Sequence, residues 1–378
     1  MSKRVAIVTG SRAEFGLLKP VMQAVHQHPD LELLVIAAGS HLISPGETYY
    51  DVKRLFPVAD TVPMQIAGRV GRHEDADATG RGIARFTRSF AGLSPDWVVV
   101  LGDRIEAFAA ATSAAIGGWA LAHLHGGDRA EGVADESLRH AITKLAHLHL
   151  PATRHSAERI ERMGEPATRV HLVGSPAIDG LDAIPPMDDA TYAELGSPRA
   201  VLLLHPIGRH DEAEEFAATT VIEALRRSDL LDSTLAMHPN HDPGRRGVLR
   251  AIEAAFDPGR VRSHLPREQF IGLLKRVADA GGIVVGNSSS ALIEAAALRV
   301  PAVDIGDRQS GRERAANVTH AADSDADAIV HAIRAALALD RGSITHPYGD
   351  GTTGVKVAGL LDRIDPRAPG FLRKLNSY

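Results

Sequence analysis

Short apolar runs recur along the chain, and each is followed by a glycine-containing or polar turn and then a helical pattern. The runs in the first half are RVAIVTG, LELLVIAAG, DWVVVLGD, WALAHLHGG, HLHLPAT and RVHLVGS, and those in the second half are AVLLLHP, STLAMHPN, RVRSHL, GGIVVGNSS and PAVDIGD. Strands that are apolar on both faces and separated by helices are typical of a parallel sheet covered on two sides. The pattern therefore predicts an α/β protein with two doubly wound parallel sheets.

One stretch interrupts this alternation and marks a domain boundary. Residues 180–199, GLDAIPPMDDATYAELGSPR, combine a proline pair, an acidic run and a Gly-Ser-Pro turn, which is typical of a linker. We expect a first domain over 1–182, a linker over 183–199, a second domain over 200–355 and a C-terminal tail over 356–378 that packs back on the first domain. Such an arrangement would place a cleft between the two domains.

Composition narrows the class of protein. With 378 residues, 44% of them hydrophobic, the chain can bury two cores. A net charge of -5 without a basic stripe argues against a nucleic-acid partner, and the lack of a long apolar run argues against a membrane span or a signal peptide, so we expect a cytoplasmic protein. The chain has no cysteine, which excludes disulfides and thiolate metal sites.

Polar residues concentrate directly after the predicted strands. In open α/β sheets ligands bind outside the carboxyl ends of the strands, so these segments are where a site is expected. They are TGSRAEFG (9–16), GDRIE (102–106), HGGDRAEGVADES (125–137), HPIGRH (205–210), HPNHDPG (238–244), GNSSS (286–290) and GDRQSGRER (306–314).

The segment GNSSSALIEAAA predicts an anion site at a helix start. Ser288, Ser289 and Ser290 would offer hydroxyls beside unpaired helical N–H groups, which suits a phosphate. The alternative is ordinary N-capping by Asn287 or Ser288, for which one side chain is enough. Glu294, on the first turns of this helix, is a candidate for sugar or ribose hydroxyls or else a surface residue.

The first glycine-containing turn, TGSRAEFG, lacks the spacing of a dinucleotide-binding fingerprint, and no Walker A pattern occurs in the chain. A nucleotide bound to the first domain in the Rossmann manner is therefore weakly supported. Arg12 could balance a phosphate held by the second domain or form a structural salt bridge, and Glu14 is a substrate-binding candidate in the same turn.

The segment HLHGGDRAEGVADESLRHAITK, residues 123–144, gathers many proton carriers around a Gly-Gly turn. Asp135 stands where a helix should begin, with Leu138, Ile142 and Leu145 as its apolar stripe, so Asp135 is either an N-cap or a functional acid. Carboxylates close together raise one another's pKa, which would make one of them a useful base. The pairs His123/His125 and His147/His149 have strand spacing and are a weaker alternative as metal ligands.

Taken together, several stretches resemble the hydrolysing UDP-N-acetylglucosamine 2-epimerases, in particular the bacterial branch that serves sialic and legionaminic acid synthesis. The matching stretches are GSRAEFG, VLGDRIEAF, HLHGGDRAEGVADESLRHAITKLAHLHL, ERMGEPATRVHLVGSPAID, GNSSSALIEAAAL and IGDRQSGRERAANV. The resemblance implies a GT-B fold with two Rossmann-like domains and an active site in the cleft between them. It also implies a reaction without metal or redox cofactor, in which a base removes the proton beside the acetamido group, UDP leaves, and water adds to the resulting glycal.

The resemblance assigns roles residue by residue. Its catalytic set maps onto Asp103, Asp128, Asp135 and His205. Its nucleotide-binding and sugar-binding positions, together with neighbouring candidates, map onto Arg12, Glu14, Arg104, His125, Ser137, Arg139, His140, His238, Asn240, Ser288, Ser289, Ser290, Glu294 and Arg308. The implied partner is a nucleotide-sugar substrate, and the family forms dimers or tetramers.

Some positions depart from the pattern of the family. Asp128 stands where the sialic-acid branch usually has Glu, so Glu131 or His125 are candidates to take over its role. The non-hydrolysing branch has a Glu where this chain has His125 and a Lys where it has Leu17, which disfavours that branch. The alternatives are a non-hydrolysing epimerase, a GT-B glycosyltransferase, or a nucleotide-sugar binding protein without catalysis.

Overall fold

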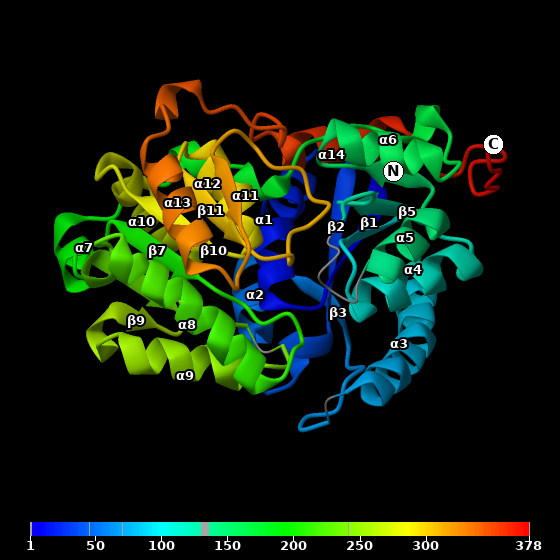
Figure 1. The fold of residues 1–378 in the computed structure, drawn as a ribbon. Coiled ribbons are helices and arrows are strands. Elements are labelled where there is room, and N and C mark those ends of the chain that lie inside the picture. Colours follow the sequence, from blue (N-terminus) through cyan, green and yellow to red (C-terminus); the bar gives the residue numbers. More distant parts are fainter. Residues whose placement is uncertain (1, 45, 70, 130–135, 241, 378) are drawn as a thin grey trace. The chain divides into compact units, whose positions relative to one another are not determined.

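The computed structural model describes residues 2–44, 46–69, 71–129, 136–240 and 242–377, whose contacts form two units. The first unit contains residues up to 128, residues 136–179 and the chain from 349 onward, and the second contains residues 180–348. Residues 183–199, expected as a linker, are thus grouped with the second unit, as are residues 180–182, which were expected in the first domain. Figure 1 shows both units and labels their elements where there is room.

A six-stranded parallel sheet forms the centre of the first unit, with strand order β3-β2-β1-β4-β5-β6. The strands are β1 (Lys3–Thr9), β2 (Leu31–Ala38), β3 (Val58–Val62), β4 (Trp97–Leu101), β5 (Ala120–Leu124) and β6 (Leu148–Leu150). The helices are α1 (Arg12–Gln27), α2 (Tyr49–Leu55), α3 (Arg72–Leu93), α4 (Ile105–Gly117), α5 (Glu136–Leu145), α6 (Arg154–Arg162) and α14 (Thr353–Arg363), with short 3-10 turns η1 (Gly39–Leu42), η2 (Ala167–Arg169) and η3 (Pro176–Ile178). This is the strand order of the Rossmann fold.

Helices cover both faces of this sheet, as the two-sided apolar pattern predicts. Val5 and Ile7 of β1 point into a core formed with α1 and α14, whereas Ala6 and Val8 point into a core formed with α3, α4 and α5. Alternate residues of a strand face opposite sides, so a strand buried on both faces must be apolar throughout. Helix α14 comes from the C-terminal end of the chain and packs against α1 (Figure 1).

The second unit repeats the plan with a sheet ordered β12-β11-β10-β7-β8-β9. Its strands are β7 (Ala200–Leu203), β8 (Thr234–Met237), β9 (Val261–Arg262), β10 (Ile283–Gly286), β11 (Ala302–Ile305) and β12 (Val318–Ala321). Its helices are α7 (Asp189–Glu194), α8 (Asp211–Arg227), α9 (Arg245–Ala255), α10 (Arg267–Asp279), α11 (Ser289–Leu292), α12 (Glu294–Ala297) and α13 (Ala326–Leu337), with 3-10 turns η4 (Leu181–Ala183), η5 (Leu231–Ser233), η6 (Pro258–Arg260) and η7 (Arg341–Ser343). Counted within the unit, the strand order equals that of the first sheet, which confirms two Rossmann-like sheets.

In each sheet the chain reverses its winding direction between the first and fourth strands, β1 and β4 in one unit and β7 and β10 in the other. The crevice outside such a switch point is where ligands bind in open α/β sheets. The residues after these four strands are therefore the ones that the fold positions for function.

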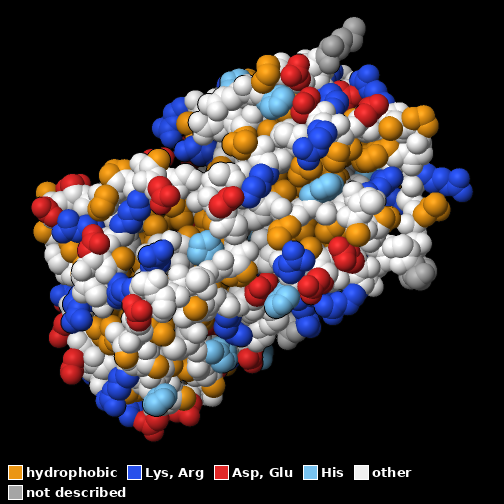
Figure 2. Space-filling model, turned by 90° about the horizontal axis from the view of Figure 1, so that it is seen from above, with side chains coloured by type: hydrophobic (Ala, Val, Ile, Leu, Met, Phe, Trp, Pro, Cys, Tyr) orange, Lys and Arg blue, Asp and Glu red, His pale blue; other side chains and the backbone are white. Residues whose placement is uncertain are grey.

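The helices of the described part of the chain include none with the length and apolarity needed to cross a membrane. On the face of the molecule shown in Figure 2, positively and negatively charged side chains are interspersed with apolar ones. The face shown carries no continuous stripe of a single sign.

Candidate functional site

At the switch point of the first unit, a fully buried carboxylate lies between the ends of β1 and β4. Glu106, in the first turn of α4, is 0% exposed. Its side chain occupies the space above two glycines, since a Cβ on Gly10 would lie 2.6 Å from Glu106 Cβ and a Cβ on Gly39 would lie 2.3 Å from Glu106 Oε1. The carboxylate accepts hydrogen bonds from Arg104 Nε (3.2 Å) and Gln65 Nε2 (3.1 Å).

A second buried acid, Glu14, lies beside this group. Its Oε2 accepts a hydrogen bond from the backbone N–H of Gly10 at 2.6 Å, and Ser11 caps the helix that carries it. Burial raises the pKa of Glu14 to about 8, and the nearby charge of Glu106 adds to the rise, against the lowering effect of the Gly10 N–H. With this pKa, Glu14 is mostly protonated at neutral pH.

An ion pair joins the end of β4 to α5. Arg139 is 4% exposed and contacts Asp103 Oδ2 through NH2, while its NH1 donates to the backbone carbonyl of His125 at 3.1 Å. Asp103 follows Gly102, whose φ of 73° lies in the left-handed region that favours glycine. The sequence separates Asp103 and Arg139 by 36 residues, and the structure brings them together.

Asp128 is buried and accepts hydrogen bonds at both oxygens. His125 Nδ1 lies 2.8 Å from Oδ2, and the Ser156 hydroxyl donates to Oδ1 at 2.7 Å. The other ring nitrogen of His125 lies 3.0 Å from Ser175 Oγ. His125 also has a φ of 58°, an unusual value for a residue with a side chain, so its backbone is held in a constrained turn. Asp128 thus fixes His125 and closes a network with Arg139, whose NH1 is 3.9 Å from Oδ2.

The remaining candidates of the first unit divide into exposed and paired residues. Arg12 and Ser137 are exposed, and His140 Nε2 lies 3.3 Å from Glu136 Oε1. Asp135 and Glu131 lie outside the described residues. In α5, Ile142 is buried as expected, but Leu138 and Leu145 are only half-buried, and Arg139 lies in the buried stripe beside them.

The histidines proposed as metal ligands have other partners. His123 Nε2 lies 2.8 Å from the Gly102 carbonyl, and burial lowers the pKa of His123 to about 3. His147 Nδ1 accepts a backbone N–H at 3.1 Å, and His149 Nε2 pairs with Glu165 at 3.0 Å. Within the described residues, the group with suitable spacing for a metal ion is elsewhere, at His28, Asp30 and Asp362.

The switch point of the second unit is bridged by Asn287. Its Oδ1 accepts the backbone N–H of His205 at 2.8 Å, and its Nδ2 donates to the His205 carbonyl at 2.8 Å. The backbone N–H of Asn240 donates to His205 Nδ1 at 3.2 Å, which leaves the ring proton on Nε2. Burial, and then the positive charge of Arg308, lower the pKa of His205 to about 3. His205 is therefore a neutral imidazole that can donate from Nε2.

The segment GNSSS begins a helical turn that is shorter than expected. Ile293 separates α11 from α12, so the predicted single helix is two helices of four residues each. Ser288 caps α11 through a 3.4 Å bond from the Ser290 N–H, as the capping alternative predicts. Ser289 and Ser290 are half-buried, as is His238, while Arg308 NH1 donates to the Asn287 carbonyl at 3.2 Å.

Glu294 is 7% exposed, so it is not the surface residue of the alternative interpretation. Arg267 NH1 lies 3.4 Å from Glu294 Oε1. Glu294 is therefore a buried, paired carboxylate at the start of α12.

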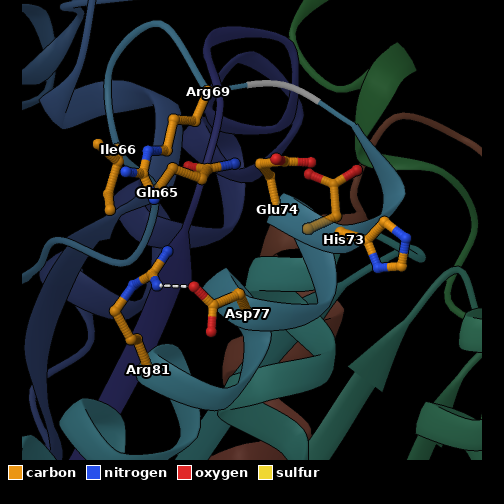
Figure 3. A pocket seen from close by; sticks show the side chains of 8 residues that line it. Gln65, Ile66, Arg69, His73, Glu74, Asp77 and Arg81 are labelled. Carbon is orange, nitrogen blue, oxygen red and sulfur yellow. Dashed lines mark hydrogen bonds and ion pairs between the residues drawn. The ribbon is translucent and has the colours of Figure 1, made fainter.

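A small cavity of about 170 Å³ lies within the first unit, between the turn after β3 and the start of α3. Figure 3 shows side chains of both charges around it, among them Arg69, Glu74, Asp77 and Arg81. This volume is below the roughly 300 to 1,000 Å³ of ligand pockets, so the cavity alone does not hold a nucleotide sugar. One wall residue, Gln65, also bonds Glu106.

Sequence reasoning missed the residues that hold the site together. They are Glu106, Ser156, Ser175 and Arg267. Glu106 lies inside the quoted segment GDRIE, but a Glu in the first turn of a helix is usually an exposed, dipole-stabilising residue. No pattern in the sequence distinguishes the buried case.

Comparisons with known proteins give the family of the chain. A family model described as UDP-N-acetylglucosamine 2-epimerase matches residues 23–362. The chain is 34% identical over the full length of both proteins to a UDP-N,N'-diacetylbacillosamine 2-epimerase (hydrolyzing) of Legionella pneumophila. It is 30% identical to a UDP-N-acetylglucosamine 2-epimerase of Neisseria meningitidis serogroup B, covering 93% of this chain and 92% of the relative.

A solved structure shares the fold. The UDP-GlcNAc 2-epimerase of Methanocaldococcus jannaschii, in complex with UDP-GlcNAc and UDP, is similar with a TM-score of 0.78 at 16% identity, covering 96% of this chain and all of that one. The GT-B fold expected from the sequence is confirmed. With a family model matching most of its length and two relatives at or above 30% identity, the chain belongs to the UDP-N-acetylglucosamine 2-epimerase family.

Proposed function

We propose that the protein is a hydrolysing 2-epimerase that converts a UDP-N-acetyl amino sugar into the free 2-epimer and UDP. The observation that carries this proposal is the network of Asp103, Arg139, Asp128 and His125 at the carboxyl ends of β4 and β5. The full-length identity with a relative whose name includes "hydrolyzing" supports it. The substrate is UDP-N-acetylglucosamine or a relative with two acetamido groups, as the names of the bacillosamine relatives suggest.

The proposed reaction needs one group to take a proton from the carbon that bears the acetamido group. We assign this role to Asp103 or Asp135. Asp103 follows β4 at the switch point, and its carboxylate is held in place by Arg139. UDP leaves from the anomeric carbon as the proton is removed, which forms a glycal. Water then adds across the double bond, with OH going to the anomeric carbon and a new proton to the opposite face of the acetamido carbon.

Asp128 takes a positioning role in this scheme. Both of its oxygens accept hydrogen bonds and it is 7% exposed, so its carboxylate is poorly placed to receive a proton from substrate. It holds the His125 ring in one orientation through the contact between Nδ1 and Oδ2. The departure from Glu to Asp at this position is compatible with the proposed activity because the shorter side chain reaches His125 and Ser156.

The second unit would bind the nucleotide. His205, with its proton on Nε2, is suited to donate a hydrogen bond to the departing phosphate as a neutral group rather than to carry a proton. We assign diphosphate and ribose contacts to Ser288, Ser289, Ser290, Glu294 and Arg308, with His238 and Asn240 beside them and Arg12 on the first unit. Arg104, Ser137 and His140 are assigned to the sugar. A cytoplasmic location and a dimer or tetramer remain predictions.

The test is turnover in deuterated water followed by NMR. UDP-N-acetylglucosamine and its diacetamido relative are each incubated with the enzyme. Free N-acetylmannosamine, or the corresponding diacetamido epimer, deuterated at the acetamido carbon, together with UDP, supports the proposal. Product that stays attached to UDP identifies a non-hydrolysing epimerase. Transfer to an acceptor without label identifies a glycosyltransferase. Binding of UDP-sugars without turnover leaves a binding protein, and each of these results refutes the proposal.

A further inference from the structure

The carboxylate of Glu106 bridges the switch point of the first sheet. Although Glu106 belongs to α4, which follows β4, its side chain turns back over the end of β1 and the start of η1. Gly10 and Gly39 have no side chain, and a methyl group on either would overlap the Glu106 side chain. The close approach of three chain segments to one side chain fixes its position.

The buried Glu106 side chain contacts a partly exposed arginine, Arg104. The Glu106 side chain is 0% exposed, whereas that of Arg104 is 44% exposed. Arg104 Nε lies 3.2 Å from Oε2 and NH2 lies 3.5 Å from Oε1, so two nitrogens of the guanidinium face the two oxygens of the carboxylate. A charge-assisted pair of this kind restricts a long side chain that would otherwise sample many rotamers.

The neighbouring Glu14 does not compete for this arginine, because its raised pKa keeps it neutral at pH 7. Gln65, from the turn after β3, donates a second hydrogen bond to this carboxylate, from Nε2 to Glu106 Oε1 at 3.1 Å. A Glu that only stabilised the helix dipole would need none of these contacts, because an exposed acid in the first turn of a helix already stabilises the dipole.

We propose that Glu106 is a positioning residue, which holds the Arg104 guanidinium in one orientation after β4 so that it can bind the sugar-side part of the substrate. The role of Arg104 rests on the proposed function, whereas the orientation of its guanidinium does not. The conservative substitution Glu106→Asp keeps the charge and shortens the reach, and Glu106→Gln keeps the shape and removes the charge.

The kinetic test is a double-mutant cycle between Glu106→Gln and Arg104→Met with UDP-N-acetylglucosamine and its diacetamido relative. We expect Glu106→Gln to lower kcat/KM by about 10- to 100-fold, the range for a lost hydrogen bond to a charged group. Glu106→Asp should recover part of this loss. The kcat/KM of the double variant should equal that of Arg104→Met within about twofold, because Glu106 acts through Arg104. Losses that multiply, or an unchanged kcat/KM in Glu106→Gln, overturn the proposal.

A second measurement needs no turnover. In ¹H–¹⁵N spectra, the Arg104 Nε–H should exchange with water at least about tenfold faster in Glu106→Gln than in the native protein, with its signal assigned through Arg104→Met. The matched control is Glu32→Gln at the amino end of the sheet, where Arg4 Nε lies 3.1 Å from Glu32 Oε2. It should change the Arg4 signal alone and leave kcat/KM unchanged.

The two measurements separate the possible failures. If the native enzyme turns over no nucleotide sugar, the proposed function fails while the exchange rate still decides whether Glu106 orients Arg104. An unchanged Arg104 exchange rate in Glu106→Gln overturns the positioning role, whatever the activity. Tryptophan fluorescence in urea checks that each variant is folded before either comparison is made.

Discussion

Glu14 makes the stability of the first unit depend on pH in a direction opposite to that of most acids. Its pKa is raised from 4.5 to about 8 in the folded state, chiefly by burial. The folded unit therefore keeps a proton that the unfolded chain releases above pH 4.5. The stabilisation that this bound proton gives the folded unit is fully present below pH 4.5 and is lost as the pH rises towards 8.

The substitution Glu14→Gln isolates this effect, because the amide is isosteric and does not titrate. From these two pKa values, linkage predicts that the free energy of unfolding of the native protein falls by about 2 kcal/mol, relative to that of Glu14→Gln, between pH 6 and pH 8. Any fixed cost of placing the amide in the buried site changes the free energy of unfolding by the same amount at pH 6 and at pH 8. The quantity to compare is therefore the change in this free energy with pH.

The assay is urea unfolding followed by tryptophan fluorescence at pH 6, 7 and 8. Both tryptophans, Trp97 and Trp119, lie in the first unit, so the signal reports on the unit that contains Glu14. The exposed variant Glu32→Gln serves as a control and should follow the native protein. If the unfolding free energies of Glu14→Gln and the native protein run parallel from pH 6 to pH 8, Glu14 is ionised in the folded state and the reasoning is wrong.

Four further outcomes are expected. Phe371→Ala should lower the stability of the first unit by about 2 to 4 kcal/mol in the same fluorescence assay, since its ring packs 5.5 Å from Trp97; a change below about 0.5 kcal/mol would contradict this. Asn287→Ala should cost about 2 to 4 kcal/mol in thermal unfolding followed by circular dichroism, because two backbone groups lose their partner, and an unchanged midpoint would argue against the bridge. Asp128→Asn should lower kcat by roughly 10²- to 10⁴-fold, since His125 loses its charged partner; near-native turnover would remove Asp128 from the site. The ring of His205 should stay neutral from pH 5 to 9 in an NMR titration because its pKa is about 3, and a midpoint near 6.5 would refute the assignment.

The central strands and the edge strands β6 and β9 were predictable from the sequence, whereas the edge strands β3 and β12 were not. Runs such as DWVVVLGD are apolar on both faces because the strand they form is buried on both. β3 and β12 lie at sheet edges and carry polar or half-buried residues, so their pattern is weak. The reverse error occurs at RVHLVGS, which was predicted as a strand but forms only an isolated bridge between His149 and Val170.

The site was predictable as a set of segments but not as a set of contacts. The rule that ligands bind at the carboxyl ends of strands selects the segments that contain Asp103, Asp128 and His205, and the family resemblance then singles out these residues. The partners Ser156, Ser175 and Arg267 lie far away along the chain and reach the site only through tertiary packing. Whether a carboxylate such as Glu106 is buried depends on the glycines opposite it, which belong to other elements.

The order of segments in the first unit has a consequence for synthesis of the chain. Residues 180–348 form the second unit, and the first unit resumes only at residue 349. The side chain of Trp97 donates to the Leu361 carbonyl, and Val357 and Leu361 fill the core beside α1. On the ribosome, the second unit can complete its fold while the first still exposes an apolar face. A protein truncated before α14 would therefore present that face to chaperones and proteases.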